Sequence, residues 1–495
     1  MNPFSRRLYI ILLLGGGGLG AAAPDSTAFG QVLPPVDDVV GPPLDDPLLD
    51  ETQHRLERGL DRPLDEGLPG DPLDDRLPGD PLDEAAGAAT APVEKAVQNA
   101  ASTTVGQTLQ SATSAATHAA QSVVKTSIGP LRPFVEGVDP FGHAIEEDVL
   151  MVLIEPDAVP KLEQSGWPVR QVRRLPSLGL VLVRIQSPPA PSLAEAAGSL
   201  RTSFPDAAVD YNFLYRLAGR ETATTAAERP ATAATRDGYL PPRAGTRLGL
   251  IDSAVWTDHS ALSGVHIVSR DFAPHDGKRP TGHGTAVASI LAANAGDDAQ
   301  ILAASVFFQK PGYAPGATSE SLLAALDWLA GSGVDVINMS LAGPADDLLE
   351  RGLARIAAGG PVVVAAVGNN GPAGEPLYPA AYESALGVTA VDREQRIFTY
   401  ANRGDHVVFA ALGVDVKVAN SGGGWRVETG TSMASPFVAA VIAGGLHDTG
   451  LPKDALIESL KASAVDLGDE GFDPVFGYGL VQPARAQNAA ASLTE

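Results

Sequence analysis

The C-terminal half of the chain alternates short apolar runs with segments of helical periodicity, and this alternation restricts the fold more than any other feature. The apolar runs cover 247–251, 301–306, 334–338, 362–367, 386–391 and 407–410, and the helical segments cover 284–293, 319–331, 348–359, 432–447 and 453–463. Strands without an exposed face, joined by helices, form a parallel sheet that helices cover on both sides. We therefore expect an α/β domain over residues 245–495, with ligands bound beyond the carboxyl ends of its strands.

A second, smaller pattern of elements occupies residues 147–217. Strands are expected at 149–154, 169–175, 180–185 and 209–217, with helices at 158–167 and 193–204. The order β-α-β-β-α-β predicts a small α+β unit of the split βαβ type. The residues that follow, 218–244, are rich in Thr, Ala, Arg and Pro, so we expect an exposed connector that is open to proteolysis.

The first 146 residues divide into three segments of different composition. Residues 1–23 join two arginines to a short apolar stretch and three alanines, which predicts a cleaved signal peptide rather than a membrane anchor. Residues 24–90 combine eleven prolines with seventeen acidic residues, so we expect a disordered acidic segment. Within it, 68–75 and 77–84 form a near-repeat, for which a solvated linker is favoured over a calcium-responsive spacer. Residues 91–146, rich in Ala, Ser and Thr, predict a linker with weak helical character.

Charge and cysteine content exclude several classes of function. The net charge is −24, and residues 25–84 alone hold seventeen acidic side chains against four arginines, so phosphate backbones are repelled and no nucleic-acid partner is expected. The absence of cysteine rules out disulfides, a thiol nucleophile, Cys-type zinc sites and a lipid-modified N-terminal cysteine. We therefore expect a monomeric bacterial protein, secreted or periplasmic, with no stable membrane anchor.

Three short segments carry reactive side chains in the order Asp, His, Ser. Gly249–Ser253 contains Asp252, Gly282–Thr285 contains His283, and Gly430–Pro436 contains Ser432. A serine hydroxyl is a weak nucleophile that needs a neighbouring base, and the base needs an anion that fixes its tautomer. Taken singly, Asp252 is explained by a loop or cap and Ser432 by a helix N-cap. The three together predict nucleophilic catalysis.

In their order and local sequence these segments resemble the subtilisin-like serine protease (subtilase) family. The resemblance implies a three-layer α/β fold with a mostly parallel sheet, in which Asp252 orients His283 and His283 activates Ser432. It also implies that Asn369, in Val-Gly-Asn-Asn-Gly, donates to the oxyanion, with Asn370 as the competing assignment. By its position, the unit at 147–217 resembles the pro-domain of such enzymes, which would act as an intramolecular inhibitor of a self-processing zymogen, and a freestanding interaction domain is the alternative.

The resemblance extends to the substrate groove. Asn338–Leu341 resembles the strand that pairs with substrate backbone, so Ser340, Leu341, Ala342 and Leu377 are the expected substrate-binding residues. Ala342 and Leu377 stand where relatives often have glycine, which predicts a shallow pocket that favours Ala, Val or Leu over Phe or Tyr. Ala254 also replaces a usual glycine, so the turn after Asp252 must avoid positive φ.

No cofactor or bound metal is expected. Oxygen-bearing side chains in 293–298 offer ligands for a structural calcium ion, but a solvated loop is the favoured interpretation. Two other classes of function remain open at this point. One is a catalytically inactive protein that keeps the groove for binding, and labelling of Ser432 by a fluorophosphonate would distinguish it. The other is an extracellular spacer or adhesion protein, which deletion of 24–90 would inactivate without touching peptidase activity.

Overall fold

The computed structural model describes residues 124–126, 134–186, 192–218, 232–233, 245–273, 277–296 and 298–482. The expected signal peptide and acidic segment lie outside these residues, as does most of the connector 218–244. Among the described residues, no helix combines the length and apolar character needed to span a bilayer.

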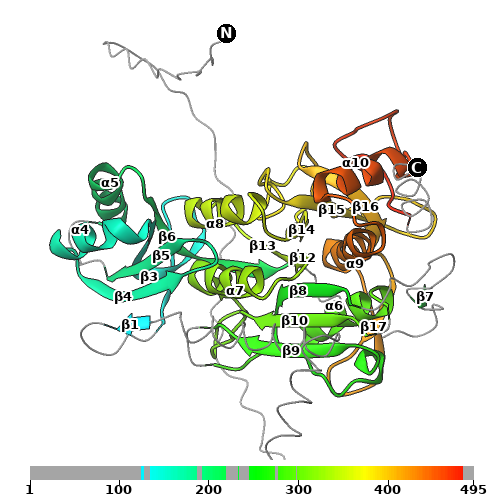
Figure 1. Ribbon diagram of the computed structural model, residues 1–495, viewed down its shortest axis with the longest axis horizontal. Helices are drawn as coiled ribbons and strands as arrows, with labels where there is room; N and C mark the ends of the chain where they lie inside the picture. The colour runs from blue at the N-terminus through cyan, green and yellow to red at the C-terminus, as the bar shows by residue number, and fades with distance from the viewer. Residues whose placement is uncertain are drawn as a thin grey trace, which may run out of the picture. The chain divides into compact units, whose positions relative to one another are not determined.

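A seven-stranded, all-parallel sheet forms the centre of the C-terminal region (Figure 1). Its strand order is β16-β15-β14-β12-β8-β10-β9. The bounds are β8 Arg247–Asp252, β9 His266–Asp271, β10 Gln300–Ser305, β12 Val336–Met339, β14 Val362–Ala366, β15 Leu386–Val391 and β16 Val407–Leu412. The order reverses between β8 and β12, and Asp252 is the last residue of β8, so this carboxylate lies where open α/β sheets bind ligands.

Helices cover both faces of this sheet and create two hydrophobic cores. On one face α6 (Gly282–Asn294) packs against α9 (Thr431–Thr449), and α10 (Lys453–Ser463) packs on α9. On the other face lie α7 (Ser319–Gly331) and α8 (Asp347–Ala357). Thr318 and Asp346 cap α7 and α8, because their side chains accept bonds from free backbone N–H groups of the first turn. These two layers of helices agree with the expected α/β architecture.

The N-terminal unit has the expected order of elements. Its strands are β3 (Ala144–Ile154), β4 (Val169–Leu175), β5 (Leu180–Gln186) and β6 (Ala208–Leu217), and its helices are η1 (Pro156–Ala158), α4 (Val159–Gln164) and α5 (Leu193–Ser203). The antiparallel order β4-β5-β3-β6 leaves β3 and β4 parallel with β5 between them, which is a split βαβ arrangement. One face of this sheet shares a hydrophobic core with α7 and α8.

The structure corrects the N-terminal boundary of this unit. Residues 91–146 were expected to be a linker of weak helical character, yet 124–126 (β1) pairs with β4, and Glu136–Val138 (β2) pairs with β3. Phe134 is buried and stacks edge-on against Phe308 of the C-terminal region, with ring centroids 5.0 Å apart. The extension therefore adds contacts to the unit, and its alanine-rich composition obscured them.

Three further features were not predicted. The edge strand β9 is half-exposed and lacks a long apolar run. The hairpin of β17 (Val416–Ala419) and β18 (Trp425–Glu428) forms a separate sheet with β7 (Thr232–Ala233), and η2 (Ser260–Leu262) is a single turn.

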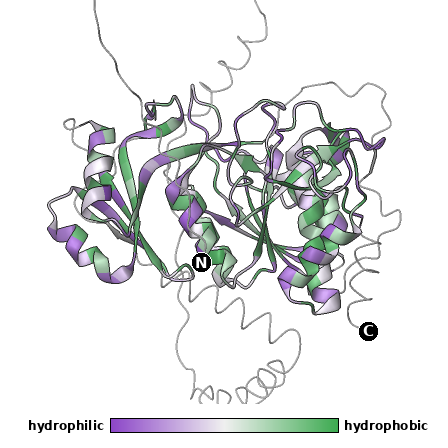
Figure 2. Cartoon of the chain, turned by 90° about the horizontal axis from the view of Figure 1, so that it is seen from above, coloured by the Kyte–Doolittle hydropathy of each residue, from purple (hydrophilic) through white to green (hydrophobic). Residues whose placement is uncertain are grey.

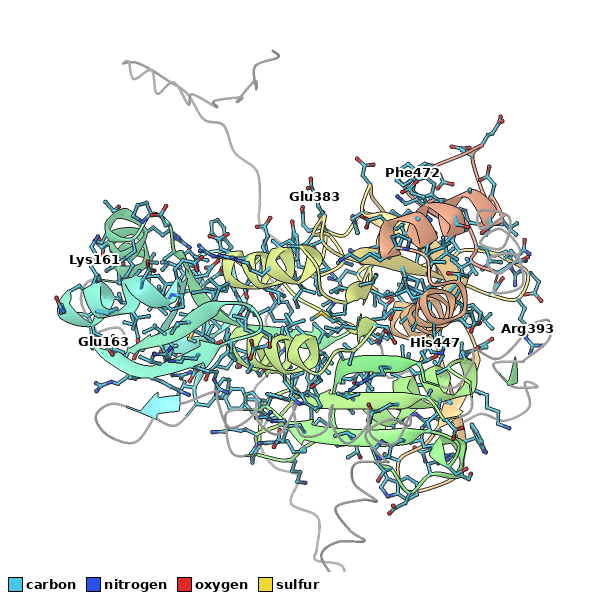
Figure 3. All side chains as sticks on the ribbon, viewed as in Figure 1. Lys161, Glu163, Glu383, Arg393, His447 and Phe472 are labelled. Atoms are coloured by element: carbon cyan, nitrogen blue, oxygen red, sulfur yellow. The ribbon has the colours of Figure 1, made fainter. Side chains whose placement is uncertain are left out.

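Figure 2 shows hydrophobic colour concentrated along the central strands and hydrophilic colour on the outer faces of the helices. Exposed charges such as Lys161 and Glu163 project from the periphery (Figure 3).

Charged side chains are buried where the N-terminal unit meets α7. Arg184 of β5 donates to Glu320 of α7 at 2.9 Å and also to Glu146 of β3. Asn212 of β6 donates to Glu146 at 2.8 Å and accepts from the backbone N–H of Glu320 at 3.0 Å, which makes it a cap for α7. Asp327, further along α7, accepts from two backbone N–H groups of the β4–β5 turn, those of Ser177 and Leu178. These polar groups lose contact with water at this surface, and the hydrogen bonds among them offset the cost of that burial.

Candidate active site

Asp252 and His283 form a buried pair at the carboxyl end of β8. His283 Nδ1 lies 2.8 and 3.0 Å from the two carboxylate oxygens of Asp252, whose side chain is fully buried. The N–H of Ser253 donates to the same carboxylate at 2.6 Å, so this buried group has a backbone donor besides His283. A carboxylate on Nδ1 holds the proton there and leaves Nε2 as the basic nitrogen.

The charge of Asp252 also sets the basicity of His283. Burial alone lowers the pKa of this imidazole, but the charge and hydrogen bond of Asp252, together with the charge of Glu428, outweigh burial, so the pKa of His283 is raised above its usual 6.5. Nε2 of His283 is buried and has no hydrogen-bond partner among the residues that the structure describes. The structure therefore joins His283 to Asp252 but gives no hydrogen bond between His283 and Ser432.

Small residues allow α6 to approach the end of β8. A Cβ on Gly284 would lie 2.2 Å from the carbonyl oxygen of Ser253, so no side chain fits there. The N–H of Gly284 donates to Ser253 Oγ at 2.8 Å. Ala254 has no positive φ, and its N–H donates to Pro280 O at 2.9 Å. The turn after Asp252 thus accommodates the alanine that replaces glycine.

Ser432 is the second residue of α9, and its carbonyl oxygen accepts a hydrogen bond from outside the helix. Pro436 lies inside α9 and has no N–H, so the carbonyl of Ser432 has no helical partner. Ser340 Oγ supplies one, donating to Ser432 O at 3.0 Å, and it also contacts Ser435 Oγ at 3.0 Å. Asn338 donates to Ser340 Oγ at 2.9 Å. Ser340 therefore ties the groove strand to the helix that carries Ser432.

The end of β6 lies in the groove that the sequence assigned to substrate. Leu217 and Arg216 pair antiparallel with Leu341 and Ala342, which form β13, and the N–H of Ala218 donates to Ser340 O at 3.3 Å. On the opposite side, β11 (Ala317–Thr318) pairs with β6 as well. The strand is thus held between two strands of the C-terminal region, in the manner of an added peptide strand.

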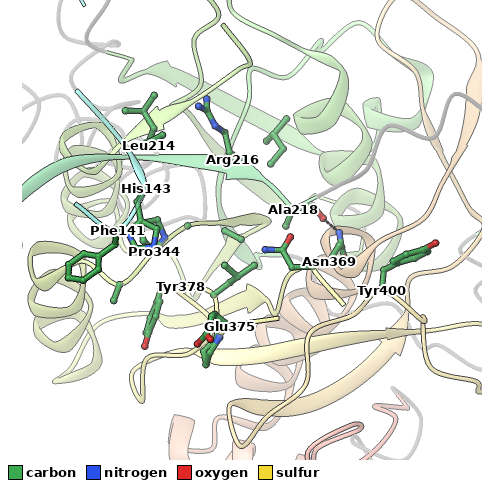
Figure 4. Close-up of a pocket in the computed structure, with 18 residues that line it drawn as sticks. Phe141, His143, Leu214, Arg216, Ala218, Pro344, Asn369, Glu375, Tyr378 and Tyr400 are labelled. Carbon is green, nitrogen blue, oxygen red and sulfur yellow. Dashed lines mark hydrogen bonds between the residues drawn. The ribbon is translucent and has the colours of Figure 1, made fainter. Parts of the chain in front are cut away.

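The carbonyl oxygen of Ala218 receives two side chains of the candidate site. Ser432 Oγ lies 2.6 Å from it, and Asn369 Nδ2 donates to it (Figure 4). Asn369 Oδ1 accepts from the N–H of Thr431 at 3.1 Å and from its hydroxyl at 3.0 Å, so the amide is oriented with its NH₂ toward Ala218. Of the two candidate asparagines, Asn369 reaches this carbonyl. Asn370 instead donates its backbone N–H to Asn402, at 2.8 Å.

Ala218 itself was not singled out by the sequence. The signal that could have found it was the end of a strong strand at Leu217, directly before a connector without apolar periodicity. Ala218 borders a cavity of about 950 Å³ that Ala342, Leu377 and Tyr378 also line (Figure 4). Gly368, with a φ of 100°, makes room for Leu377, since a Cβ there would lie 2.4 Å from Leu377 Cδ1. Phe141 and His143 of the N-terminal unit also line this cavity, so its volume in the precursor does not measure the P1 pocket of the mature enzyme. The preference for small residues at P1 stays a prediction.

The described part of the chain contains no group of three or more His, Asp or Glu side chains that could hold a metal ion. Of the segment 293–298, Asp297 lies outside the described residues. The expectation that no metal or cofactor is bound therefore stays a prediction.

Residues 243–479 match the model of the subtilase family of peptidases. Over 250 residues the chain is 32% identical to subtilisin DY from Bacillus licheniformis, an alignment that covers 48% of this chain and 89% of that relative. The chain belongs to the subtilase family. Membership assigns the matched region to the serine-type endopeptidases. This subtilase is also 32% identical over 263 residues to the minor extracellular protease Epr of Bacillus subtilis (strain 168). That match covers 50% of the chain but only 40% of Epr.

Solved structures confirm the fold of this subtilase. Fervidolysin from Fervidobacterium pennivorans, a keratinolytic enzyme related to subtilisin, superposes with a TM-score of 0.55 at 20% identity, covering 73% of this chain and 62% of that chain. An epidermin leader peptide processing serine protease from Staphylococcus aureus gives a TM-score of 0.52 at 18% identity, covering 70% and 99%. Both shares exceed the part matched by the family model, so the likeness in fold extends beyond the peptidase domain.

Proposed function

We propose that this protein is a secreted serine endopeptidase, made as a zymogen that cuts its own chain between Ala218 and Gly219. In this scheme residues up to Ala218 fold the enzyme and then inhibit it, and the mature enzyme begins at Gly219. The observation that carries the proposal is the Ala218 carbonyl, which lies against Ser432 Oγ and Asn369 Nδ2 while its backbone pairs with the groove strand.

The proposed chemistry starts with His283 Nε2 taking the proton of Ser432 Oγ. The oxygen then attacks the carbonyl carbon of Ala218, and the resulting oxyanion is stabilised by Asn369 Nδ2 and the N–H of Ser432, near the positive end of α9. Collapse of this intermediate breaks the bond to Gly219, whose nitrogen receives the proton from His283. Water then attacks the acyl-enzyme, again with His283 as base, and frees the Ala218 carboxylate. Asp252 stabilises the imidazolium in both halves.

Inhibition after cleavage follows from how firmly the N-terminal unit is held. The cleaved strand keeps its pairing with β13 and β11, and the buried contacts of Arg184 and Asn212 with α7 remain. Many contacts on a preorganised surface favour a tight complex. A second cut in the unit or its connector would then release the active form. Proteins and peptides are the proposed substrates, because the groove recognises an extended backbone.

Secretion is proposed from the sequence of residues 1–23, which has the order of charges, apolar residues and small residues of a signal peptide. The name of the extracellular relative Epr supports the same location.

Mass spectrometry of the exported wild-type protein, beside Ser432→Ala, tests the proposal. Wild type should yield a fragment starting at Gly219, and Ser432→Ala should stay uncut in a protease-free host. A fluorophosphonate should label Ser432 in the mature form. Normal processing of Ser432→Ala would rule out self-cleavage, and a folded protein that neither hydrolyses peptides nor takes the label would instead be an inactive binding protein.

A further inference from the structure

Tyr215 of β6 fills a closed pocket three residues before Ala218. Its side chain is fully buried, although it belongs to a strand that lies in an open groove. The ring lies directly on Gly343, where a Cβ would come within 2.5 Å of Tyr215 Cδ1. On the backbone side, Tyr215 pairs with Ala317 of β11. Gly343 and Ala317 both belong to the peptidase domain, so these walls remain when the N-terminal unit is removed.

The hydroxyl of Tyr215 meets acceptors at the closed end of this pocket. Tyr215 Oη lies 3.3 Å from Asp346 Oδ2 and 3.4 Å from the carbonyl oxygen of Pro344. Asp346 is 1% exposed, so the carboxyl is a buried acceptor in the peptidase domain. An aliphatic side chain at this position would leave that acceptor without the hydroxyl.

The position of Asp346 is fixed by its other bonds. Asp346 Oδ1 caps α8, accepting from the N–H groups of Leu348 at 2.8 Å and Leu349 at 3.3 Å. Tyr382 Oη accepts from the N–H of Asp346 at 2.8 Å and donates to its carbonyl oxygen at 2.9 Å. Because helix cap and backbone are both held, Oδ2 is preorganised to face a ligand hydroxyl.

With the proposed cut at Ala218, the residues before it occupy successive subsites. Counting back from the cut, Ala218 is P1, Leu217 is P2, Arg216 is P3 and Tyr215 is P4. We infer, resting on the proposed function, that this protease selects substrates with tyrosine at P4 and reads the phenol hydroxyl through Asp346. The favoured substrates are therefore protein segments with tyrosine four residues before the cut and a small residue at P1.

Selection for the hydroxyl follows from the loss of one donor to a buried carboxyl, because the Ser319 side chain, which also hydrogen-bonds Asp346, does not take the place of the phenol. Phenylalanine fills the same volume over Gly343 but brings no donor to Asp346 Oδ2, and a site built for a hydroxyl rejects the analogue that lacks it. We expect weaker selection among side chains at P3 than at P4. Arg216 donates to the carbonyl oxygens of Ala314 and Pro315, but its ion-pair partner Glu136 belongs to the N-terminal unit and is absent for a free substrate.

Matched peptides test the inference on the mature enzyme obtained from the full-length chain. The pair is Tyr-Arg-Leu-Ala and Phe-Arg-Leu-Ala, each with a fluorogenic amine as the leaving group on Ala. We expect kcat/KM to be about tenfold higher for the tyrosine peptide, the size of one hydrogen bond to a buried acceptor. Equal values, or a preference for phenylalanine, overturn the inference.

Variants locate the preference. Asp346→Asn should bring the tyrosine-to-phenylalanine ratio toward one, while Asp347→Asn, an exposed neighbour that loses the same charge, should keep the ratio. The ratio compares two substrates on one preparation, so a partial loss of folded enzyme cancels. If Asp346→Asn does not fold, slower release of the Gly219 fragment from the Tyr215→Phe precursor decides instead, and unchanged release overturns the inference. An enzyme that cleaves neither peptide nor itself overturns the proposed function as well, whereas cleavage without preference overturns this inference alone.

Discussion

Arg184 and Glu320 form an ion pair of 2.9 Å in which each side chain is only 3% exposed. The guanidinium comes from β5 of the N-terminal unit and the carboxylate from the first turn of α7. Glu146 is a second carboxylate partner of Arg184, and Arg173, which is more exposed, lies 3.5 Å from Glu320. Arg184 is therefore the buried cation that two buried anions share. Such an arrangement contributes specificity to the contact, and it makes the contact vulnerable to loss of the cation.

Arg184→Ala should therefore destabilise the uncut precursor by about 3–5 kcal/mol, because Glu146 and Glu320 lose the buried cation that they share and only the more exposed Arg173 stays near Glu320. Urea unfolding of the Ser432→Ala precursor, with and without the second substitution, measures this. Arg174→Ala is the control, since Arg174 is exposed on the neighbouring strand β4. Similar effects of the two substitutions would show that the buried ion pair contributes no more to the free energy of unfolding than an exposed arginine does.

Asn369→Ala should lower kcat by about 10²–10³, a magnitude that comes from subtilisin, with little change in KM. The reason is that its Nδ2 points at the carbonyl that develops negative charge. Steady-state kinetics on a peptide substrate measures the effect. Asn370→Ala is the matched control, because that residue bonds through its backbone N–H and should retain most of the activity. Losses of equal size would contradict the assignment.

The activity should rise with pH through a midpoint above 6.5. His283 acts as a base only when neutral, and the charge of Asp252 raises the pKa of His283. A profile of kcat/KM against pH on the mature enzyme checks this. A midpoint well below 6.5 would argue that Asp252 does not set the basicity.

The contact between the N-terminal unit and α8 should weaken as pH rises. Burial raises the pKa of Asp210 from 3.8 to about 6, and burial and then the charge of Asp210 raise that of Asp346 to about 7. Both carboxyls hold protons more tightly in the folded precursor than in the unfolded chain. Their contribution to stability is therefore complete below about pH 4 and is lost as pH rises through 6 and 7.

Urea unfolding of the Ser432→Ala precursor between pH 4 and 8 measures this decline. Asp210 faces Arg201 at 3.4 Å and the N–H of Asp347 at 3.2 Å, whereas Asp346 faces Tyr215 and Tyr382. Asp210→Asn should flatten the pH dependence, and the exposed Asp206→Asn should leave it unchanged. A precursor that grows more stable across this range would contradict the assignment.

Leu377→Gly should widen the set of residues accepted at P1. Leu377 lines the cavity beside Ala218 and packs onto Gly368. We expect wild type to favour Ala, Val or Leu at P1, and the variant to gain at least severalfold in kcat/KM for Phe, because a cavity forms where the leucine was. A peptide library varied at P1 compares the two enzymes. A wild type that already prefers aromatic residues would refute the prediction.

The sequence predicted the elements that have strong periodicity. Helices α7 and α10 have the expected bounds, and β8 and β15 agree to within a residue, because apolar runs and helical periodicity are local features of the sequence. The edge strand β9 and strand β18 were not predicted, since half-exposed strands carry little apolar signal. Strand β17 is mostly buried but has only four residues. Phe134 escaped too, because its contact with Phe308 joins positions far apart in the sequence.

The candidate site was predictable at the level of residue types but not of contacts. Asp252, His283, Ser432 and Asn369 lie in motifs with narrow spacing. The bond from Ser340 to Ser432 O depends on a vacancy that Pro436 creates inside α9, and no local pattern reveals it. The same holds for Tyr215, whose contact with Asp346 requires knowledge of strand register.

Three acidic residues of the peptidase domain, two on α7 and one at the N-cap of α8, contact the N-terminal unit. The charge on this surface therefore differs between the precursor and the mature enzyme. Glu320, Asp327 and Asp346 are each at most 5% exposed while the unit is in place. Its departure removes Arg184 from Glu320 and two N–H donors from Asp327, and it opens the pocket above Asp346 to water. One face of the mature protease thereby becomes anionic, so ionic strength and basic ligands will affect the mature form in ways that the precursor does not share.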